Sequence, residues 1–245
     1  MPASSNFQQA IREAQSSALV GPNVVNKALP YVGGGMVLTA GGVAGGLALL
    51  ASNPSAFQPL FWVALIGNFI LFFVAQNVAL KGNSSTALPL LTLYSLLTGF
   101  TLSGIVALAI GTAGIGSIGV AALATGVTFV IASVLGRRMS DSVGQSLSAV
   151  VGLGIVGLLI AMVVQIIGGI FAPGVFHGGS FELLIAGFGT VLFVGAAFVD
   201  FYTMPRTYSD DQYLAGALGM YLTYINLFIF ILRLIIALNG GGRRD

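Results

Sequence analysis

The sequence feature that most constrains the fold is a series of seven long apolar runs. Short segments rich in polar residues, proline or glycine separate them. A helix needs about 20 consecutive apolar residues to cross the hydrocarbon core of a bilayer. The runs cover approximately Tyr31–Leu50, Leu60–Leu80, Ala87–Ile110, Ile115–Leu135, Leu147–Phe171, Phe181–Thr203 and Tyr213–Leu238. A β-barrel would need segments of about ten residues that alternate apolar with polar, and the stretch 155–164 does not alternate. We therefore predict an all-α membrane protein, a bundle of seven transmembrane helices.

The composition excludes several classes of function. Only 7% of the 245 residues are charged, whereas soluble domains carry about 25%. The Lys and Arg residues are scattered over loops and ends, so we expect no nucleic-acid partner. One histidine and no cysteine leave no metal site of the usual kind, and we expect no cofactor. The common catalytic motifs are absent, so the chain is not expected to be an enzyme.

The basic residues favour a cytoplasmic N-terminus, because Lys and Arg concentrate in cytoplasmic loops. In that orientation the first three outer loops contain no Lys or Arg. The inner segments contain Arg12, Lys27, Lys81, Arg137, Arg138 and Arg206. Seven spans would place Arg243 and Arg244 outside, against the same rule, so the side of the C-terminus stays open. A bacterial-type inner membrane or an internal membrane is the expected location.

The chain divides into a polar N-terminal tail, residues 1–29, and a transmembrane domain, residues 30–245. In the tail, apolar residues from Phe7 to Ala18 follow helical spacing with polar residues between them. This pattern is typical of a short amphipathic helix on the membrane surface, and an unstructured tail is the alternative. In the first span, Gly41–Gly46 contains two overlapping small-xxx-small pairs, which allow two helices to approach closely.

Ionisable side chains are costly inside a bilayer and therefore point to function. Asp200 lies near the inner end of the sixth span. A carboxyl group in a partly dehydrated site can exchange a proton near neutral pH, and its oxygens can bind a cation. The alternative is an interfacial carboxylate that pairs with Arg206 or caps nearby backbone. We predict that Asp200 senses protons or lines an ion path.

Other polar residues are weaker candidates. Thr223 and Asn226 are three residues apart in the seventh span, so they share one helix face and could line the same path. Arg233 is long enough to reach the headgroups and is more often an anchor than a ligand. Gln165 is expected to form hydrogen bonds between helices. Glu182 and His177, near the start of the sixth span, are expected to lie in water.

Several segments resemble the Bax inhibitor-1 family, also called the transmembrane Bax inhibitor motif family. Residues 99–105, GFTLSGI, are similar to the family segment GFTLSSI. Residues 136–140, GRRMS, resemble the basic turn TKRDLS after the fourth span. Residues 220–234 are similar to LYLDIINLF followed by LLRLL. The similarity extends from about Pro30 to the C-terminus. It is based on the order and spacing of these segments taken together.

The resemblance implies a seven-helix bundle whose C-terminal helix lies centrally among the other six. It also implies a pH-modulated leak of calcium or another cation, or a membrane stress regulator. The alternative is a membrane partner that does not transport and that binds a larger complex such as an AAA protease. The family carries a pair of aspartates, one late in the sixth helix and one in the seventh. Asp200 matches the first, and Thr223 occupies the position of the second.

Overall fold

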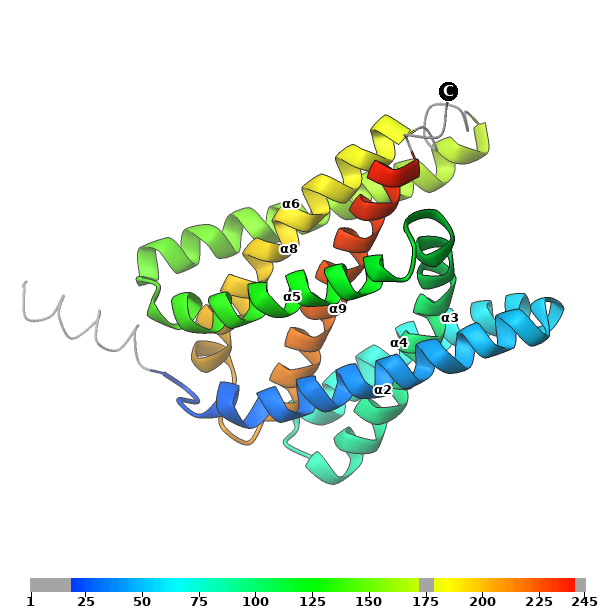
Figure 1. The fold of residues 1–245 in the computed structure, drawn as a ribbon. Helices are drawn as coiled ribbons and strands as arrows, with labels where there is room; N and C mark the ends of the chain where they lie inside the picture. Colours follow the sequence, from blue (N-terminus) through cyan, green and yellow to red (C-terminus); the bar gives the residue numbers. More distant parts are fainter. Residues whose placement is uncertain (1–18, 172–178, 241–245) are drawn as a thin grey trace, which may run out of the picture.

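The computed structural model describes residues 19–171 and 179–240, and seven of its helices are long and apolar enough to cross a membrane (Figure 1). The described residues contain no β-strand. This confirms the predicted fold class. The spanning helices are α2 (Val24–Ser52), α3 (Pro54–Leu80), α4 (Ser84–Ala113), α5 (Gly116–Leu135), α6 (Asp141–Phe171), α8 (Gly179–Thr207) and α9 (Tyr213–Gly240). A short 3-10 helix, η1 (Gly136–Arg138), follows α5.

Most helices extend beyond their apolar runs, and polar residues cap α3 and α4 at their starts. The side chain of Asn53 accepts a hydrogen bond from the Ala56 backbone N–H at the start of α3, and Asn83 does the same for Thr86 at the start of α4. Such capping satisfies backbone donors that the first turn leaves unpaired. The expected boundaries stopped at the apolar residues and were too short, by seven residues at the start of α2, where Asn23 forms no side-chain cap.

The expected amphipathic helix of the tail lies outside the described residues, and the division into tail and transmembrane domain stays a prediction. Residues 24–29, which the division assigns to the tail, already belong to α2.

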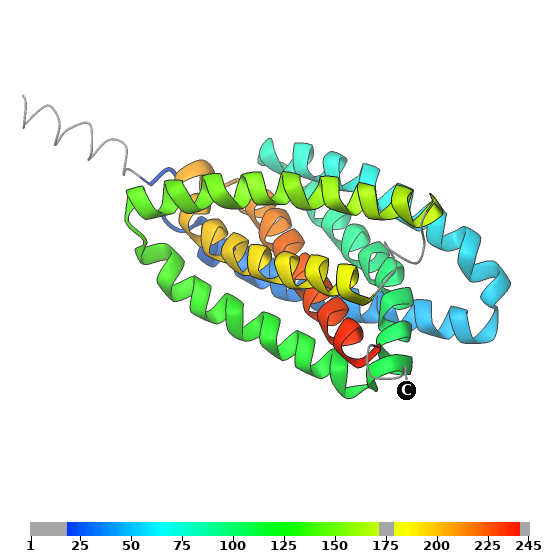
Figure 2. The same ribbon diagram turned by 90° about the horizontal axis from the view of Figure 1, so that it is seen from above.

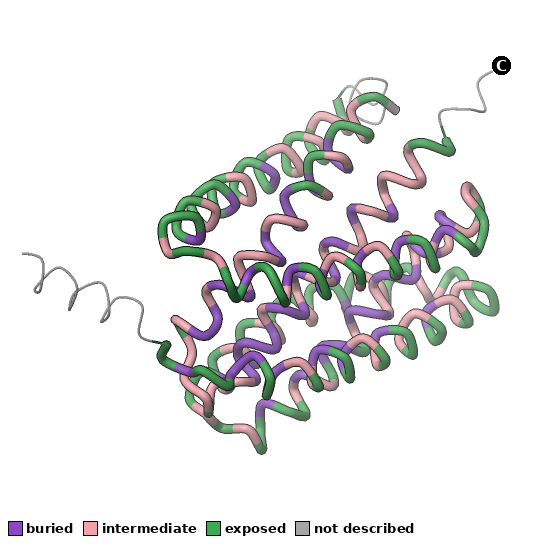
Figure 3. Tube along the Cα trace, turned by 60° about the vertical axis from the view of Figure 1, so that its left-hand side comes forward, coloured by how far each residue is buried: buried purple, intermediate pink, exposed green. Residues whose placement is uncertain are grey.

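Helix α9 is the axis of the bundle, as expected (Figures 1 and 2). It packs against α8, α2, α4, α5 and α3. All three clusters of buried apolar side chains include residues of α9. Buried positions follow α9 along most of its length, whereas the outer helices expose the faces that point away from it (Figure 3). The outward faces carry many exposed large apolar side chains, as expected of surfaces that contact lipid.

Helices α2 and α4 approach each other closely along a line of small residues. A Cβ built on Gly99 of α4 would lie 2.0 Å from the backbone oxygen of Thr39, and one on Gly42 of α2 would lie 2.2 Å from that of Leu96. Gly41 and Gly45 have open space beside them. Of the two overlapping pairs in the sequence, Gly42 with Gly46 is thus the one that packs.

Gly99→Ala should destabilise the bundle, because its methyl group meets backbone atoms that cannot rotate away. We expect a loss of about 1–3 kcal/mol, the usual cost of overpacking, measured as a lower midpoint of thermal unfolding in detergent. The matched control is Gly104→Ala on the same helix, where a Cβ meets nothing within 4 Å. Equal midpoints for the two variants would contradict the close approach.

Candidate functional site

Asp200 of α8 lies against the central helix, where it interacts with the side chain of Thr223 of α9. Its Oδ2 atom is buried and has no hydrogen-bond partner among the described residues. Helix α8 continues to Thr207, so Asp200 lies about 10 Å inside the end of the helix. That is about twice the depth that the shorter expected span gave. The extra turn brings Asp200 nearer to the level of Thr223.

Two further polar side chains, one near the carboxyl group and one reached through it, extend this site. Tyr208, directly after α8, interacts with the side chain of Gln76 of α3 and lies within electrostatic range of Asp200. Burial raises the pKa of the Tyr208 phenol, so its hydroxyl stays protonated. The Oε1 atom of Gln76 is buried without a hydrogen-bond partner among the described residues. Tyr208 thus connects Gln76 with the surroundings of Asp200, and each of these two residues has one buried acceptor oxygen, Asp200 Oδ2 and Gln76 Oε1, without a hydrogen-bond partner among the described residues.

We call Asp200, Thr223, Tyr208 and Gln76 the carboxyl site. Each residue comes from a different part of the bundle, namely α8, α9, the α8–α9 loop and α3. Among the described residues, no group of three or more His, Cys, Asp or Glu side chains gathers in the manner of a metal centre. Asp200 is the one acidic residue of the carboxyl site, and its three companions are neutral.

Arg206 does not pair with Asp200. Its guanidinium donates to Asp141 Oδ1 at 3.1 Å and to the Tyr202 carbonyl at 2.7 Å, and it stacks on the Tyr202 ring at 4.0 Å. Arg206 thereby joins α8 to the start of α6. The simplest structural alternative for Asp200, an ion pair with Arg206, is thus wrong in this structure.

The loop between α8 and α9 is tied to the start of α2 and the end of α3. Asp210 accepts hydrogen bonds from the backbone and side chain of Asn23 at 3.0 and 3.2 Å, and its Oδ2 lies 3.8 Å from the Lys27 ammonium. Gln212 donates to the Leu80 carbonyl at 2.8 Å. These bonds hold in place the loop that carries Tyr208.

A second polar cluster lies at the opposite end of the bundle. Arg233 of α9 donates to both carboxylate oxygens of Glu182 of α8, at 2.7 and 2.9 Å, and to Gln165 Oε1 of α6 at 3.1 Å. Only 14% of the Arg233 side chain and 27% of the Glu182 side chain are exposed. Arg233 is therefore part of an inter-helix ion pair rather than a headgroup anchor. Glu182, which was expected to lie in water, is its partner.

The polar residues singled out in the sequence separate into distinct groups, apart from His177, which lies outside the described residues. Asp200 and Thr223 come together, and Gln165 and Arg233 belong to the distant cluster. Asn226 donates to the Leu222 carbonyl in its own helix at 2.9 Å. Sequence reasoning assigned neither Tyr208 nor Gln76 to the site. The available signal for Gln76 was an amide within an apolar run, four residues before the end of α3.

Comparison with known proteins assigns the fold to a family. Residues 21–240 match the family model described as "Inhibitor of apoptosis-promoting Bax1". An uncharacterized membrane protein of Streptococcus pyogenes serotype M1 is 29% identical over 185 residues, which cover 72% of this chain and 75% of the relative. Bax inhibitor 1 of Schizosaccharomyces pombe is 39% identical over 54 residues, 22% of this chain and 20% of the relative. Protein lifeguard 4 of Mus musculus is 31% identical over 64 residues, 26% of this chain and 27% of the relative.

Arg233→Gln should destabilise the bundle, because it leaves Glu182 with an uncompensated charge between helices. Breaking a fully buried pair costs about 3–5 kcal/mol, and partial exposure reduces our expectation to about 1–3 kcal/mol. Thermal unfolding in detergent measures the loss. The double variant that also carries Glu182→Gln should recover part of it.

Arg138→Gln is the matched control, since Arg138 is exposed at the other end of the bundle. If Arg233→Gln and Arg138→Gln unfold at the same temperature, the ion pair does not stabilise the fold.

Proposed function

Because the chain belongs to the Bax inhibitor-1 family of multi-pass membrane proteins, we propose that it is a pH-modulated leak for calcium or another cation. Asp200 is the group that exchanges a proton for the cation. The observation that carries the proposal is the buried Oδ2 atom of Asp200, which has no hydrogen-bond partner among the described residues.

A buried oxygen without a hydrogen-bond partner indicates that another atom or molecule binds to it at some stage. Buried polar atoms in proteins are almost always hydrogen-bonded, and an exception points to a proton, water or ion that completes the site. A bare carboxylate between helices in a bilayer is costly. Asp200 therefore either holds a proton or shares its charge with a cation. Competition between the two makes cation binding depend on pH.

The surroundings of Asp200 favour weak binding of a hard cation. Calcium takes six to eight oxygen ligands, and its affinity rises with the number of charged ligands. The carboxyl site offers the Asp200 oxygens, the Thr223 hydroxyl, the Tyr208 hydroxyl and the Gln76 carbonyl. Only Asp200 carries a charge. A site with one charge releases calcium readily, which suits a leak better than a store.

Thr223 sets this chain apart from the pattern of paired aspartates. Two neighbouring carboxyl groups titrate as a coupled pair in two steps. A single carboxyl group beside a hydroxyl group takes up its proton in one step. We expect the flux of this chain to follow a single protonation step.

Charge distribution supports a cytoplasmic N-terminus. At the end of the bundle where α2 begins lie Lys27, Lys81, Arg137, Arg138 and Arg206, and among the described residues Arg233 is the basic residue of the opposite half. Basic residues favour the cytoplasmic side. The carboxyl site then lies in the cytoplasmic half of the membrane, close to the cytoplasmic loops.

Single cysteines test the orientation, since the natural chain has none. Ser52→Cys, at the end of α2, should react with a membrane-impermeant maleimide in intact cells. Ser85→Cys, at the start of α4, should react only after the cells are permeabilised. Both serines are exposed, so the reverse pattern of labelling would invert the assignment.

Asp200→Asn should abolish cation flux, because the amide carries no charge and cannot exchange a proton. Calcium entry into proteoliposomes measures the effect, with the variant expected at the level of empty liposomes across pH. The natural protein should lose flux as pH falls, since protonated Asp200 cannot bind the cation. Thr223→Val, which removes one oxygen at similar volume, should reduce flux without changing the direction of its pH dependence.

Asp211→Asn is the matched control. Asp211 is an exposed carboxylate of the α8–α9 loop, and the Ser209 hydroxyl, which donates to it, lowers its pKa. This variant should keep full flux. Equal flux in the natural protein and in Asp200→Asn would remove Asp200 from the mechanism. It would favour the second candidate, a membrane partner that binds a larger complex without transporting.

A further inference from the structure

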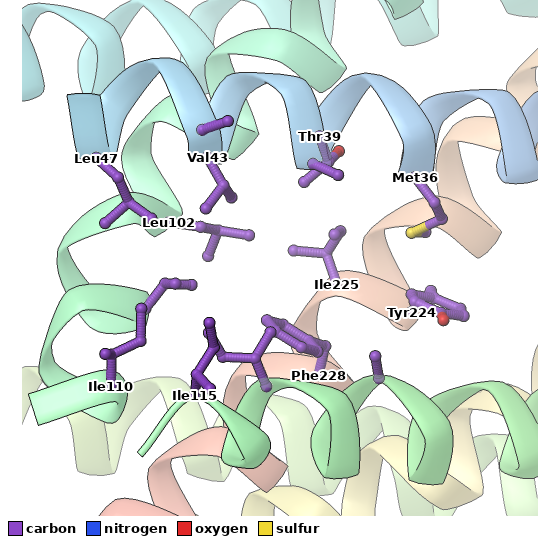
Figure 4. A pocket seen from close by; sticks show the side chains of 15 residues that line it. Met36, Thr39, Val43, Leu47, Leu102, Ile110, Ile115, Tyr224, Ile225 and Phe228 are labelled. Atoms are coloured by element: carbon purple, nitrogen blue, oxygen red, sulfur yellow. The ribbon is translucent and has the colours of Figure 1, made fainter. Parts of the chain in front are cut away.

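We propose that the cavity between α2 and α5 binds one acyl chain of a membrane phospholipid, from the leaflet at the end of the bundle where α2 ends. The cavity has a volume of about 360 Å³, within the range of small-molecule sites in proteins. Its side walls come from α2 and α5, and its floor comes from α4 and α9 (Figure 4).

The position of the cavity decides which molecules can reach it. Within the described residues α2 and α5 are not packed against one another, although both pack against α9. The opening between them lies along membrane-spanning helices, so its surroundings are hydrocarbon. Ala40 and Ala44 of α2 and Ala122 of α5 line the cavity and are exposed. These small side chains leave the opening wide enough for a chain to enter sideways.

The length of the cavity matches one leaflet. Along α2 it runs from Met36 to Leu47, which is about 16 Å at 1.5 Å per residue. Half of the hydrocarbon core is about 15 Å. The end near Leu47 reaches Ile110 and Ile115, which flank the turn between α4 and α5 (Figure 4). A phospholipid with its headgroup at that turn would therefore place its acyl chain along the cavity.

The chemistry of the lining excludes water as a stable occupant. Thr39 and Tyr224 are the only lining residues with side-chain hydroxyls. The Thr39 hydroxyl is already bonded to the Gly35 carbonyl at 2.8 Å and to the Tyr221 hydroxyl. A buried water needs two to four polar partners, and Tyr224 alone supplies one. Filling the cavity with methylene groups avoids the loss of dispersion contacts along its walls.

Photo-crosslinking tests the proposal. The protein is reconstituted in vesicles of phosphatidylethanolamine and phosphatidylglycerol that contain a phosphatidylcholine with a diazirine near the end of one acyl chain. Mass spectrometry then maps the labelled residues. Ile225 and Phe228 form the cavity floor on the central helix, so label on them requires a chain inside the cavity. A diazirine near the glycerol should instead label residues at the Leu47 end.

Ala44→Phe with Ala122→Phe should fill the cavity and lower the labelling of α9 at least about tenfold. The matched control is Gly45→Phe with Leu123→Phe, which places the same rings on neighbouring positions outside the cavity. Label on the exposed residues Phe69 and Phe73 of α3 reports ordinary bilayer contact and should not change.

Two outcomes would overturn the proposal. The first is an unlabelled α9 in the natural protein while α3 is labelled. The second is equal labelling of α9 in the filled and the control variants. Gel filtration and circular dichroism identify a filled variant that does not fold, and Ala122→Leu then serves as the milder substitution. Neither outcome bears on cation flux, because the cavity lining does not include Asp200.

Discussion

Hydrocarbon offers no hydrogen bonds, so every polar group within the spans must find its partners inside the protein. Hydrogen bonds within the helices satisfy the backbone N–H and C=O groups. Ion pairs between side chains of different helices neutralise charges near both ends of the bundle. Arg206 meets Asp141 at one end of the bundle, and Arg233 meets Glu182 at the other. Both pairs join α8 or α9 to another helix. Asp200 is an exception, because one of its oxygens is buried without a hydrogen-bond partner among the described residues.

The central position of α9 connects these features. Its faces carry Thr223 toward α8, Tyr221 toward α2 and α4, and Arg233 toward α6 and α8. A change in the rotation of α9 would therefore alter the carboxyl site and the distant ion pair together. Asp200 and the ion pair of Arg233 with Glu182 lie at opposite ends of the bundle. Both nevertheless involve side chains of the same helix, α9.

Much of this architecture could be predicted from the sequence. Apolar runs gave the seven spans because hydrophobicity and length decide insertion, and the segments around Gly99 and Met220 indicated the family. The partners of the ionisable residues could not be predicted. Whether Arg206 meets Asp141 or Asp200 depends on which helices are neighbours. Glu182 lies in the first turn of α8, where the apolar pattern of the sequence does not indicate its partner. Gln76 and Tyr208 belong to the site because α3 and the α8–α9 loop meet there. The local sequence around either residue does not indicate this contact.

The central helix is also the last spanning helix along the chain. Spanning helices leave the ribosome in sequence order, so the other six enter the membrane before the element that they surround. Until α9 is inserted, the faces of α2, α4, α5 and α8 that pack against it in the finished bundle lack that partner. The native core of this bundle can therefore form only after its seventh spanning helix has entered the membrane.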